Sequence, residues 1–438
     1  MRGAAGASIV AGGLVASSCL GQVAFAADQD FGTSSCCANL EQRIAELEAT
    51  AARKGNRKVS LAVSGQVNKA ILFWDDGGER NAYVVGNKND QTSFSFTGEA
   101  AISANVTAGY HLDVRLRDTL SDAVDQQNAN GDPGFFVWHS EWWVESKELG
   151  TVSVGLVSRV SDTAPEADLS MATVAGYAGV QDIGGAFQLR LDTGSLAPVV
   201  WGDLYNHFNG DTANLMRYDS PETAGFVAAA SFGEDDVWDI GLRYGHDTSA
   251  FHFDAAIAYT EVSDGDNSVI GNALGLDQAT LVGSLSLLHH ATGLNFTFAA
   301  GRRSWEEAIL DLDGVRRTPE DPCFVYTKLG WISRHSHLGP TAFYGEYGWF
   351  SDFVSATDRP DFLASLDASG SAVRISGNEA EVLGAGVVQH IETAEMQIYI
   401  GYRHHTAHFD LVDATGRDTP ARDVDDFDTV IAGTKVAF

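Results

Sequence analysis

The chain has 438 residues, a formal net charge of −31 at pH 7, and a composition with 46 glycines, 9 prolines and 10% aromatic residues. This acidic balance argues against nucleic acid as a partner, because such binding depends on clustered lysine and arginine. The aromatic and glycine content favours a folded, strand-rich chain over a disordered one. Four cysteines without a C-x-x-C pair predict neither a disulfide scaffold nor a zinc site.

The first 26 residues have the pattern of a secretory signal peptide. Arg2 precedes a run of small and apolar residues between positions 4 and 20, and the tripeptide AFA at 24–26 matches an A-x-A cleavage site. Glycine and serine dilute the apolar run, which weighs against a membrane anchor. We therefore expect residues 1–26 to be removed from the mature protein.

A short amphipathic helix is predicted within residues 27–57. Its apolar positions repeat with the spacing of a coiled-coil seam, which consists of Cys37, Leu40, Ile44, Leu47 and Ala51. Two heptads are only marginally stable alone. The helix is therefore either a contact between chains that other surfaces already hold together, or a solvated helix on the protein's own surface.

From residue 58 to the end, the apolar pattern has a period of two. KVSLAVSGQVNKAILFW places Val63, Val67 and Ile71 on one face of a strand and Gln66 and Asn68 on the other. About sixteen such segments follow, with no helical domain between them. Very short turns alternate with long acidic loops, an asymmetry typical of a transmembrane barrel with two unlike rims. A β-sandwich or a β-helix explains this asymmetry less well.

The chain ends in TVIAGTKVAF, an alternating strand whose last residue is Phe438. Chain ends are usually frayed and polar unless something pairs with them. In a closed barrel, the last strand pairs with the first and no edge remains. The sequence therefore predicts an all-β fold, a 16-stranded antiparallel transmembrane β-barrel over residues 58–438 that follows the short coiled-coil-like helix.

The final strand, which ends in Phe438, resembles the sorting signal that the barrel assembly machinery reads in Gram-negative outer-membrane barrels. KGNRKVSLAVSGQVNKAILFWDDG, WGDLYNHFNGDTANLMRYDSPETAGFVAAASFGEDDVWD and the cysteine-containing heptad resemble one family, the general porins of alphaproteobacteria of the rhizobial and Brucella type. The resemblance implies a homotrimeric diffusion pore in the outer membrane, in contact with lipids and lipopolysaccharide. Residues 27–57 are then expected in the periplasm, where the heptads meet their partner chains.

The resemblance also implies an inward loop after the fifth strand. In porins, the carboxylates of the third extracellular loop face basic residues on the wall and set ion preference. The candidate is the stretch 158–185, whose carboxylates are Asp162, Glu166, Asp168 and Asp182. An external loop with ordinary solvated carboxylates is the alternative.

The first candidates for the basic wall are Arg115 and Arg117, which share the polar face of one strand with His111 and Asp113. An arginine that faces the lumen costs little, whereas one that faces lipid near the midplane costs about 2–4 kcal/mol. The alternation therefore favours a lumenal position for these residues.

Three further arginines and the following strand complete the candidate wall. Arg190, Arg217 and Arg243 are weaker candidates, and a rim residue or an ion pair within the wall is the alternative for each. In the strand FFVWHSEWWVES, the alternation places Phe136 and Trp138 on the face opposite His139.

We interpret the sequence as a passive diffusion pore for small hydrophilic solutes and ions, without a cofactor. It contains no G-x-S-x-G, H-E-x-x-H or Walker A motif. Three alternatives remain open. A substrate-specific channel predicts an aromatic ladder or a basic track along the lumen, an adhesive or structural protein uses the barrel only as an anchor, and a secreted all-β enzyme needs a catalytic constellation.

Overall fold

The computed structural model describes residues 59–131, 133–233, 237–263, 277–306, 308–310, 316–354, 360–367, 373–413 and 415–438. The expected signal peptide, the segment 27–57 and the heptad residues Cys37, Leu40, Ile44, Leu47 and Ala51 lie outside the described residues. None of the described helices is long and apolar enough to cross a membrane.

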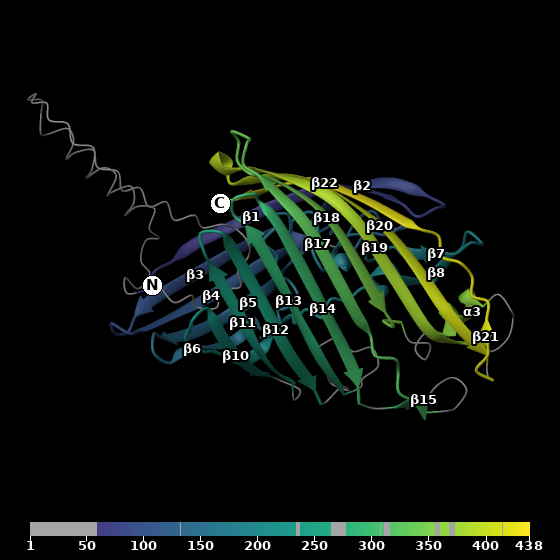
Figure 1. Cartoon of the computed structure of the whole chain (residues 1–438), viewed down its shortest axis with the longest axis horizontal. Coiled ribbons are helices and arrows are strands. Elements are labelled where there is room, and N and C mark those ends of the chain that lie inside the picture. The colour runs from purple at the N-terminus through teal and green to yellow at the C-terminus, as the bar shows by residue number, and fades with distance from the viewer. Residues whose placement is uncertain are drawn as a thin grey trace, which may run out of the picture.

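Antiparallel strands form one closed wall (Figure 1). In chain order, the wall strands are β1 (Ala62–Asp75), β2 (Arg80–Gly86), β3 (Ser93–Ala101), β4 (Val106–Arg117), β5 (Gly134–Ser146), β6 (Gly150–Ser158), β9 (Thr212–Asp219), β10 (Phe226–Gly233), β11 (Val237–Asp247), β12 (Phe251–Val262), β13 (Gln278–His289), β14 (Leu294–Trp305), β17 (Cys323–Ser333), β18 (Thr341–Ser351), β19 (Val373–Ile391), β20 (Met396–Asp413) and β22 (Phe427–Ala437). β2 and β3 share one position beside β1, so the described wall has sixteen positions. This confirms the predicted 16-stranded barrel.

The shorter elements lie in the connections between wall strands. They are η1 (Lys88–Asp90), η2 (Val180–Asp182), β7 (Gln188–Arg190), β8 (Leu196–Val200), α2 (Trp201–Leu204), β15 (Ile309–Leu310), β16 (Arg316–Arg317), α3 (Pro360–Leu366), η5 (Glu392–Ala394) and β21 (Asp418–Thr419). β7 and β8 pair only with each other, whereas β21 lengthens the edge of β20. In Figure 1, β7, β8, α3 and β21 lie together at the end of the barrel opposite the C-terminus.

The two rims differ in the length of their connections. At the rim that holds the C-terminus, which we call the turn rim, residues 147–149 join β5 to β6 and residues 248–250 join β11 to β12. At the opposite loop rim, residues 159–211 separate β6 from β9. β10 and β11 are an exception, because only three residues separate their loop-rim ends. The alternation of turns and loops in the sequence thus matches the two rims.

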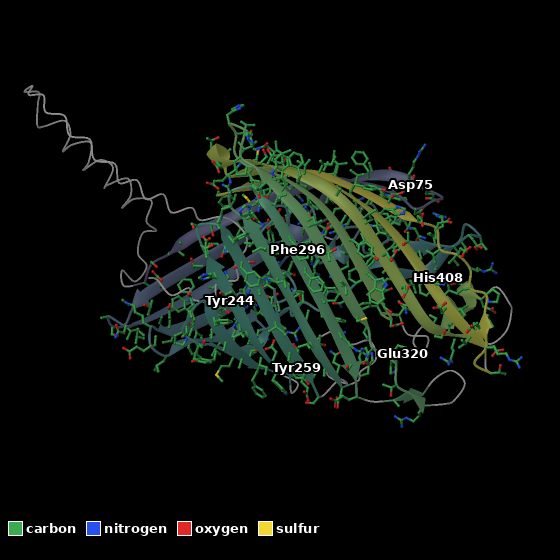
Figure 2. The ribbon with its side chains drawn as sticks, in the orientation of Figure 1. Asp75, Tyr244, Tyr259, Phe296, Glu320 and His408 are labelled. Carbon is green, nitrogen blue, oxygen red and sulfur yellow. The ribbon has the colours of Figure 1, made fainter. Side chains whose placement is uncertain are left out.

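The wall alternates between an apolar outer face and an inner face that is rich in polar residues. On β1, the outward side chains of Val67 and Ile71 are 45% and 44% exposed, whereas Asn68 is buried. The period-two pattern predicts this phase correctly, because neighbouring residues of a strand point to opposite faces. Figure 2 shows the side chains along the wall, with Tyr244 near the turn rim and Tyr259 closer to the loop rim.

The last strand closes the barrel. β22 pairs with β1 from Gln66 opposite Ala437 to Asp75 opposite Asp428. Phe438 continues the pairing, because its N–H donates to the Gly65 carbonyl at 2.9 Å and its own carbonyl accepts from Gly65 N–H at 3.0 Å. A β-carbon at position 65 would lie 2.7 Å from the Phe438 ring, so this contact requires glycine. The predicted closure is confirmed, and the sorting role of Phe438 stays a prediction.

Candidate functional site

The connection between β6 and β9, residues 159–211, folds into the barrel, and we call it the inward segment. The Ala167 N–H donates to Ser284 Oγ on β13 at 2.9 Å. Farther around the wall, Arg403 Nη1 on β20 donates to the Val180 carbonyl at 3.1 Å. The segment therefore contacts inward-facing residues on widely separated strands.

The inward segment extends beyond the predicted loop, which ends at residue 185, and carries an apolar core of its own. The ring of Phe187 lies 5.1 Å from that of Phe427 on β22, and Trp201 stacks on the same ring at 5.7 Å. Phe187, Trp201 and Phe427 are 0–1% exposed. Apolar side chains of the inward segment thus pack against the start of β22. The alternating pattern of β22 does not indicate that another segment packs on it.

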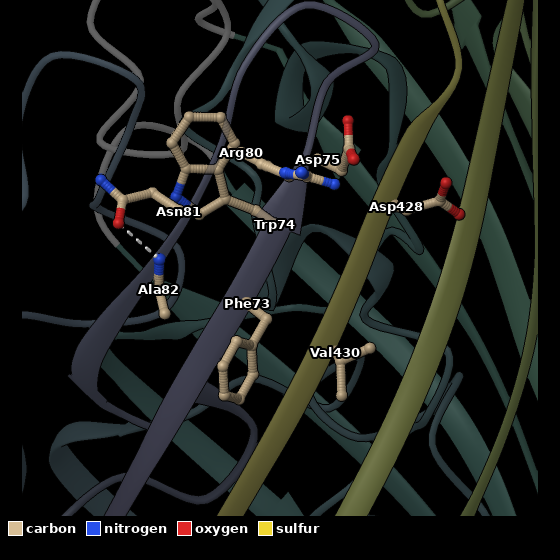
Figure 3. Close-up of a pocket in the computed structure, with 8 residues that line it drawn as sticks. All are labelled: Phe73, Trp74, Asp75, Arg80, Asn81, Ala82, Asp428 and Val430. Carbon is tan, nitrogen blue, oxygen red and sulfur yellow. Dashed lines mark hydrogen bonds between the residues drawn. The ribbon is translucent and has the colours of Figure 1, made fainter.

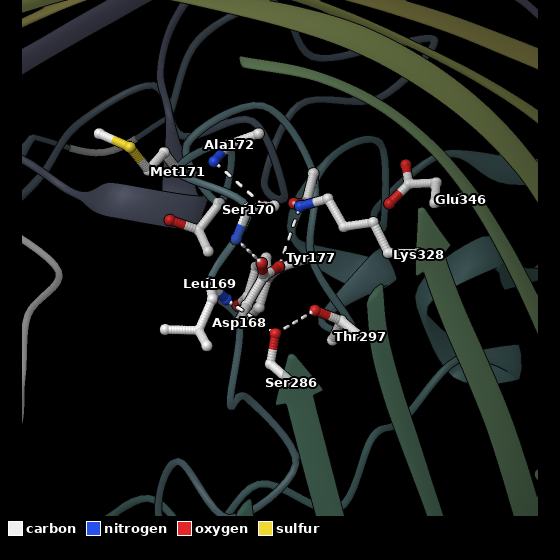
Figure 4. A network of polar contacts seen from close by, with 12 residues as sticks. Asp168, Leu169, Ser170, Met171, Ala172, Tyr177, Ser286, Thr297, Lys328 and Glu346 are labelled. Atoms are coloured by element: carbon white, nitrogen blue, oxygen red, sulfur yellow. Dashed lines mark hydrogen bonds and ion pairs between the residues drawn. The ribbon is translucent and has the colours of Figure 1, made fainter. Parts of the chain in front are cut away.

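Asp168 lies in a buried polar network that joins the inward segment to β17 and β18 (Figure 4). Lys328 Nζ donates to Asp168 Oδ2 at 2.9 Å and to the Gly176 carbonyl at 2.6 Å, and it lies 4.6 Å from the centre of the Tyr344 ring. The Lys328 and Asp168 side chains are 0% and 3% exposed. Asp168 was predicted to face basic wall residues, and its partner is a lysine that the sequence analysis missed.

A second buried ion pair adjoins this network. Arg403 Nε lies 2.7 Å from Glu346 Oε1, and the two side chains are 2% and 0% exposed. The Tyr326 hydroxyl donates to Glu346 Oε2 at 2.5 Å, and Arg403 Nη2 donates to the Tyr177 carbonyl at 2.9 Å. A buried ion pair is stable only when its remaining hydrogen-bonding groups are also satisfied. These added bonds fix the inward segment to the wall.

Asp162 and Glu166 bond to the inward segment itself. Asp162 Oδ1 accepts from Asn209 Nδ2, and Glu166 Oε1 pairs with His207 Nε2, both at 2.9 Å. Burial raises the pKa of the Asp162 carboxyl to about 6, and the nearby Glu166 charge acts in the same direction. The charge of Asp162 therefore changes near pH 6.

Asp182 is also buried by other side chains. The Tyr177 hydroxyl donates to its carboxylate, and Ser121 Oγ donates to its backbone carbonyl at 2.6 Å. Burial raises the pKa of the Asp182 carboxyl to about 6. The charge of Asp182 therefore changes near pH 6, as that of Asp162 does.

Lys88 and Asp122 link Asp182 to the wall of β4. Lys88 Nζ lies 3.7 Å from Asp122 Oδ2, with side chains 30% and 28% exposed. Burial raises the pKa of the Asp122 carboxyl, and the charges of Lys88 and Arg117 oppose that rise. Asp182 interacts electrostatically with both Lys88 and Asp122. Sequence reasoning missed this pair, because both residues lie in connections without a strand pattern.

Arg217 and Arg243 lie on the wall and hold the start of the inward segment. Arg217 forms a bidentate pair with Asp219, at 2.8 and 2.7 Å, and donates to the Arg159 carbonyl at 3.2 Å. Arg243 Nη1 donates to Thr163 Oγ1 at 3.0 Å. Both guanidinium groups are therefore occupied by protein partners.

Arg190 is not on the wall, which corrects the sequence-based expectation. It lies on β7 and forms a bidentate pair with Asp76, between Nε and Oδ1 at 2.9 Å and between Nη2 and Oδ2 at 2.8 Å. Its carbonyl accepts from Asp425 N–H at 2.8 Å. Burial opposes the shift, but the Arg190 hydrogen bonds lower the pKa of the Asp76 carboxyl. The alternating Leu189-Arg190-Leu191 resembles a wall strand, although it belongs to a two-stranded sheet at the loop rim.

Several inward side chains of β4 and β5 remain partly exposed, although Asp113 and His139 are buried, and we call this region the open wall. It comprises His111, Asp113, Arg115 and Arg117 on β4 with Phe136 and Trp138 on β5. Arg115 Nε contacts Asp113 Oδ1 at 3.3 Å, and the Arg115 side chain is 24% exposed. His111 Nε2 lies 3.0 Å from Ser95 Oγ, and its side chain is 25% exposed. Of the predicted wall residues, these four share one face as expected.

A β-bulge changes the faces of β5 and corrects the predicted alternation. Asp113 lies opposite His139 and Val114 opposite Val137, so Trp138 has no partner on β4. Trp138 therefore faces inward next to His139, and the Arg115 guanidinium carbon lies 4.0 Å from its ring centre. The Arg117 guanidinium carbon lies 5.2 Å from the centre of the Phe136 ring.

The described residues contain no group of three or more His, Cys, Asp or Glu side chains that could hold a metal ion. A pocket at the loop rim, drawn in Figure 3, lies between β1, β2 and β22 and is lined in part by Phe73, Ala82 and Val430. Phe73 is 46% exposed on the outer face of the barrel. This pocket belongs to the outer surface, so the lumenal site is formed by the inward segment and the open wall.

A closed antiparallel barrel with an apolar outer face, a partly polar inner face and a long segment folded inside defines an outer-membrane channel protein. Residues 14–419 match the model of the Gram-negative porin family, and the chain belongs to this family. The family and the barrel locate the protein in the outer membrane, as predicted, and identify a channel rather than an enzyme.

Solved structures with the same fold have remote sequences. The anion-selective porin from Comamonas acidovorans is 14% identical with a TM-score of 0.54, and the alignment covers 87% of this chain and 100% of that chain. In-vitro folded OmpT, an outer membrane protein of Vibrio cholerae, is 11% identical with a TM-score of 0.50, and the alignment covers 88% and 99%. No curated protein matches the sequence.

Proposed function

We propose that the protein is a passive diffusion pore for small hydrophilic solutes and ions, narrowed by the inward segment against the open wall. The observation that carries the proposal is the unequal occupation of the lumen. The inward segment buries Lys328, Glu346 and Arg403 on one side, whereas Arg115 and His111 keep about a quarter of their side chains exposed on the other. Solutes then pass beside the open wall.

The constriction in this proposal is electrostatic as well as steric. Asp182 and Glu166 supply carboxylates from the inward segment, and Arg115 and Arg117 supply the opposing basic groups. Asp122 interacts electrostatically with Asp182 on one side and with Arg117 on the other, and Lys88 interacts with both Asp182 and Asp122. Charges of both signs across a narrow passage create a transverse field that orients dipolar solutes and sets ion preference.

We further propose a homotrimer of the alphaproteobacterial type, in contact with outer-membrane lipids and lipopolysaccharide. The resemblance of the first strand, of the segment that begins with α2 and of the cysteine-containing heptad supports this subtype. A trimer would give the predicted heptads of Leu40, Ile44 and Leu47 their partner chains, and Phe438 would serve as the signal for the barrel assembly machinery.

Single-channel conductance of the purified native protein in a planar bilayer tests the proposal. We expect stepwise conductance whose closures come in threes, and a reversal potential under a salt gradient that reports which side of the constriction dominates. A folded, heat-modifiable protein that leaves the bilayer silent would contradict the diffusion pore and favour the anchoring alternative. Single, independent closures would contradict the trimer only.

A further inference from the structure

The bulge in β5 aligns aromatic rings with arginines along the open wall. Trp138 and Phe136 lie edge to face with ring centres 6.1 Å apart, and Trp138 meets His139 edge to face at 6.2 Å. Arg115 lies over the Trp138 ring, and Arg117 lies over the Phe136 ring. The result is a ladder of two stacked arginine–aromatic pairs on the lumenal face.

The guanidinium groups of this ladder retain binding capacity. Arg115 uses Nε for Asp113 at 3.3 Å, which leaves the N–H groups of both terminal nitrogens for another acceptor. Within the described residues, Arg117 has no hydrogen bond or ion pair, and neither arginine bonds to the inward segment. This contrasts with Arg217 and Arg403, whose guanidinium groups are buried and bonded.

The geometry selects a particular kind of solute. The face of Trp138 next to Arg115 is already covered, so a sugar ring has no open aromatic platform there. A guanidinium stacked on one ring presents its other planar face, on which a second flat ring can stack. Its terminal N–H groups suit a carboxylate, which a guanidinium binds through two parallel hydrogen bonds. Two residues along a strand span about 6.6 Å, so Arg115 can stack with a ring while Arg117 binds its carboxylate.

We propose that the open-wall ladder is a binding site for small aromatic carboxylates on their way through the pore. The solute ring stacks on the exposed face of Arg115, and its carboxylate pairs with Arg117. The inference rests on the proposed function, because it needs an open lumen beside β4 and β5. It adds a preference for one class of solute to a pore that passes other small solutes as well.

The test uses the purified full-length protein in a planar bilayer, with benzoate as the probe. Benzoate is expected to interrupt the potassium chloride current in a concentration-dependent way, from which its binding constant follows. Cyclohexanecarboxylate carries the same charge without a flat ring, and benzyl alcohol carries the ring without the charge. Both are expected to bind at least about five-fold more weakly than benzoate, cyclohexanecarboxylate because it loses the stacking contact and benzyl alcohol because it loses the charge-assisted hydrogen bonds of the carboxylate.

The decisive variants change either the aromatic ring of Trp138 or the planar guanidinium of Arg115. Trp138→Leu removes the ring beneath Arg115, and Arg115→Lys keeps the charge but loses the planar group. Each is expected to weaken benzoate binding at least about five-fold. Trp143→Leu is the matched control. Trp143 is on the same strand and face, because it occupies the space that a side chain at Gly109 would need, but it contacts neither arginine.

The outcomes separate the inference from the proposed function. Equal binding of benzoate and cyclohexanecarboxylate to a conducting wild-type channel would overturn the ladder site and leave the pore intact. An equal loss in Trp143→Leu and Trp138→Leu would also overturn it. If Trp138→Leu does not fold, Arg115→Lys decides. A wild-type protein without conductance would overturn the pore and the ladder site together.

Discussion

The two sides of the lumen use charged side chains in opposite ways. Beside β17, β18 and β20, Lys328 and Arg403 are 0% and 2% exposed, and each pairs with a carboxylate. On the open wall, Arg115 is 24% exposed, and Arg117 forms no hydrogen bond or ion pair with a described residue. Both sides read alike in the sequence, as polar residues on the inner face of a strand. The inward segment causes this difference, because it buries the charged side chains on one side of the lumen and leaves those on the other side exposed.

This comparison separates stability from conduction. A buried charge must be paired, so the covered side carries energy that is lost when one partner is removed. An exposed lumenal charge adds little to stability but acts directly on passing ions. The covered side is therefore expected to determine whether the inward segment stays in place, and the open wall to determine what passes.

The largest expected effect is on the covered side. Arg403→Met leaves the Glu346 carboxylate buried without its partner, which is expected to cost about 3–5 kcal/mol in the free energy of unfolding. Urea unfolding of the barrel in lipid measures it. Arg302→Met is the matched control, because Arg302 pairs with Asp321 at 2.9 Å but is 67% exposed, and a loss below about 1 kcal/mol is expected. Equal losses in the two variants would remove the distinction between the sides.

An intermediate effect is expected from pH. The pKa values of Asp162 and Asp182 are raised to about 6, so both carboxyls lose their charge as the pH falls from 7 to 5. The reversal potential is then expected to shift toward anions with a midpoint near pH 6. Because these pKa values lie above the usual value of 3.8, the two groups stabilise the fold at low pH, and that stability is lost as the pH rises through 6.

The double variant Asp162→Asn with Asp182→Asn is the control for the pH effect. It is expected to abolish the midpoint near pH 6 in the reversal potential and the pH dependence of the unfolding free energy between pH 3.8 and about 6. A midpoint that persists in this variant would assign the titration to other groups and would contradict the assignment to the inward segment.

The smallest effect on stability is expected on the open wall. Arg115→Gln and Arg117→Gln are expected to change the unfolding free energy by less than about 1 kcal/mol, because Arg115 is partly exposed in its pair with Asp113 and Arg117 has no ion pair among the described residues. Both are expected to shift the reversal potential toward cations. Arg217→Gln provides the contrast, since it breaks a buried bidentate pair with Asp219 and is expected to destabilise the barrel more strongly. An open-wall variant that unfolds as readily as Arg217→Gln would contradict the comparison.

The barrel could be predicted from the sequence because each strand reports its own two faces. Val67 and Ile71 alternate with Gln66 and Asn68, and the structure places them outward and inward as expected. The same reasoning is wrong at Trp138, because one extra residue in β5 reverses the phase of the strand beyond it. Nothing in FFVWHSEWWVES marks which residue is the extra one.

The contacts between residues of the site were harder to predict from the sequence than the residues themselves. The stretch around Asp168 could be singled out by its length and its carboxylates. Its partner Lys328 lies far away in the sequence, on a strand whose alternation is ordinary. A local pattern indicates which way a side chain points but not what lies opposite across the barrel. For the same reason, the pairing of Arg190 with Asp76 at the loop rim had no signal in the sequence.

The packing of Phe427 on Phe187 and Trp201 has a consequence for how the barrel assembles. Phe427 begins β22, the strand that completes the wall by joining β1. Its ring therefore packs on the inward segment at the point where β22 and β1 close the barrel. We therefore expect the inward segment to occupy the lumen before β22 pairs with β1. Pairing of these two strands and packing of the inward segment would then stabilise each other.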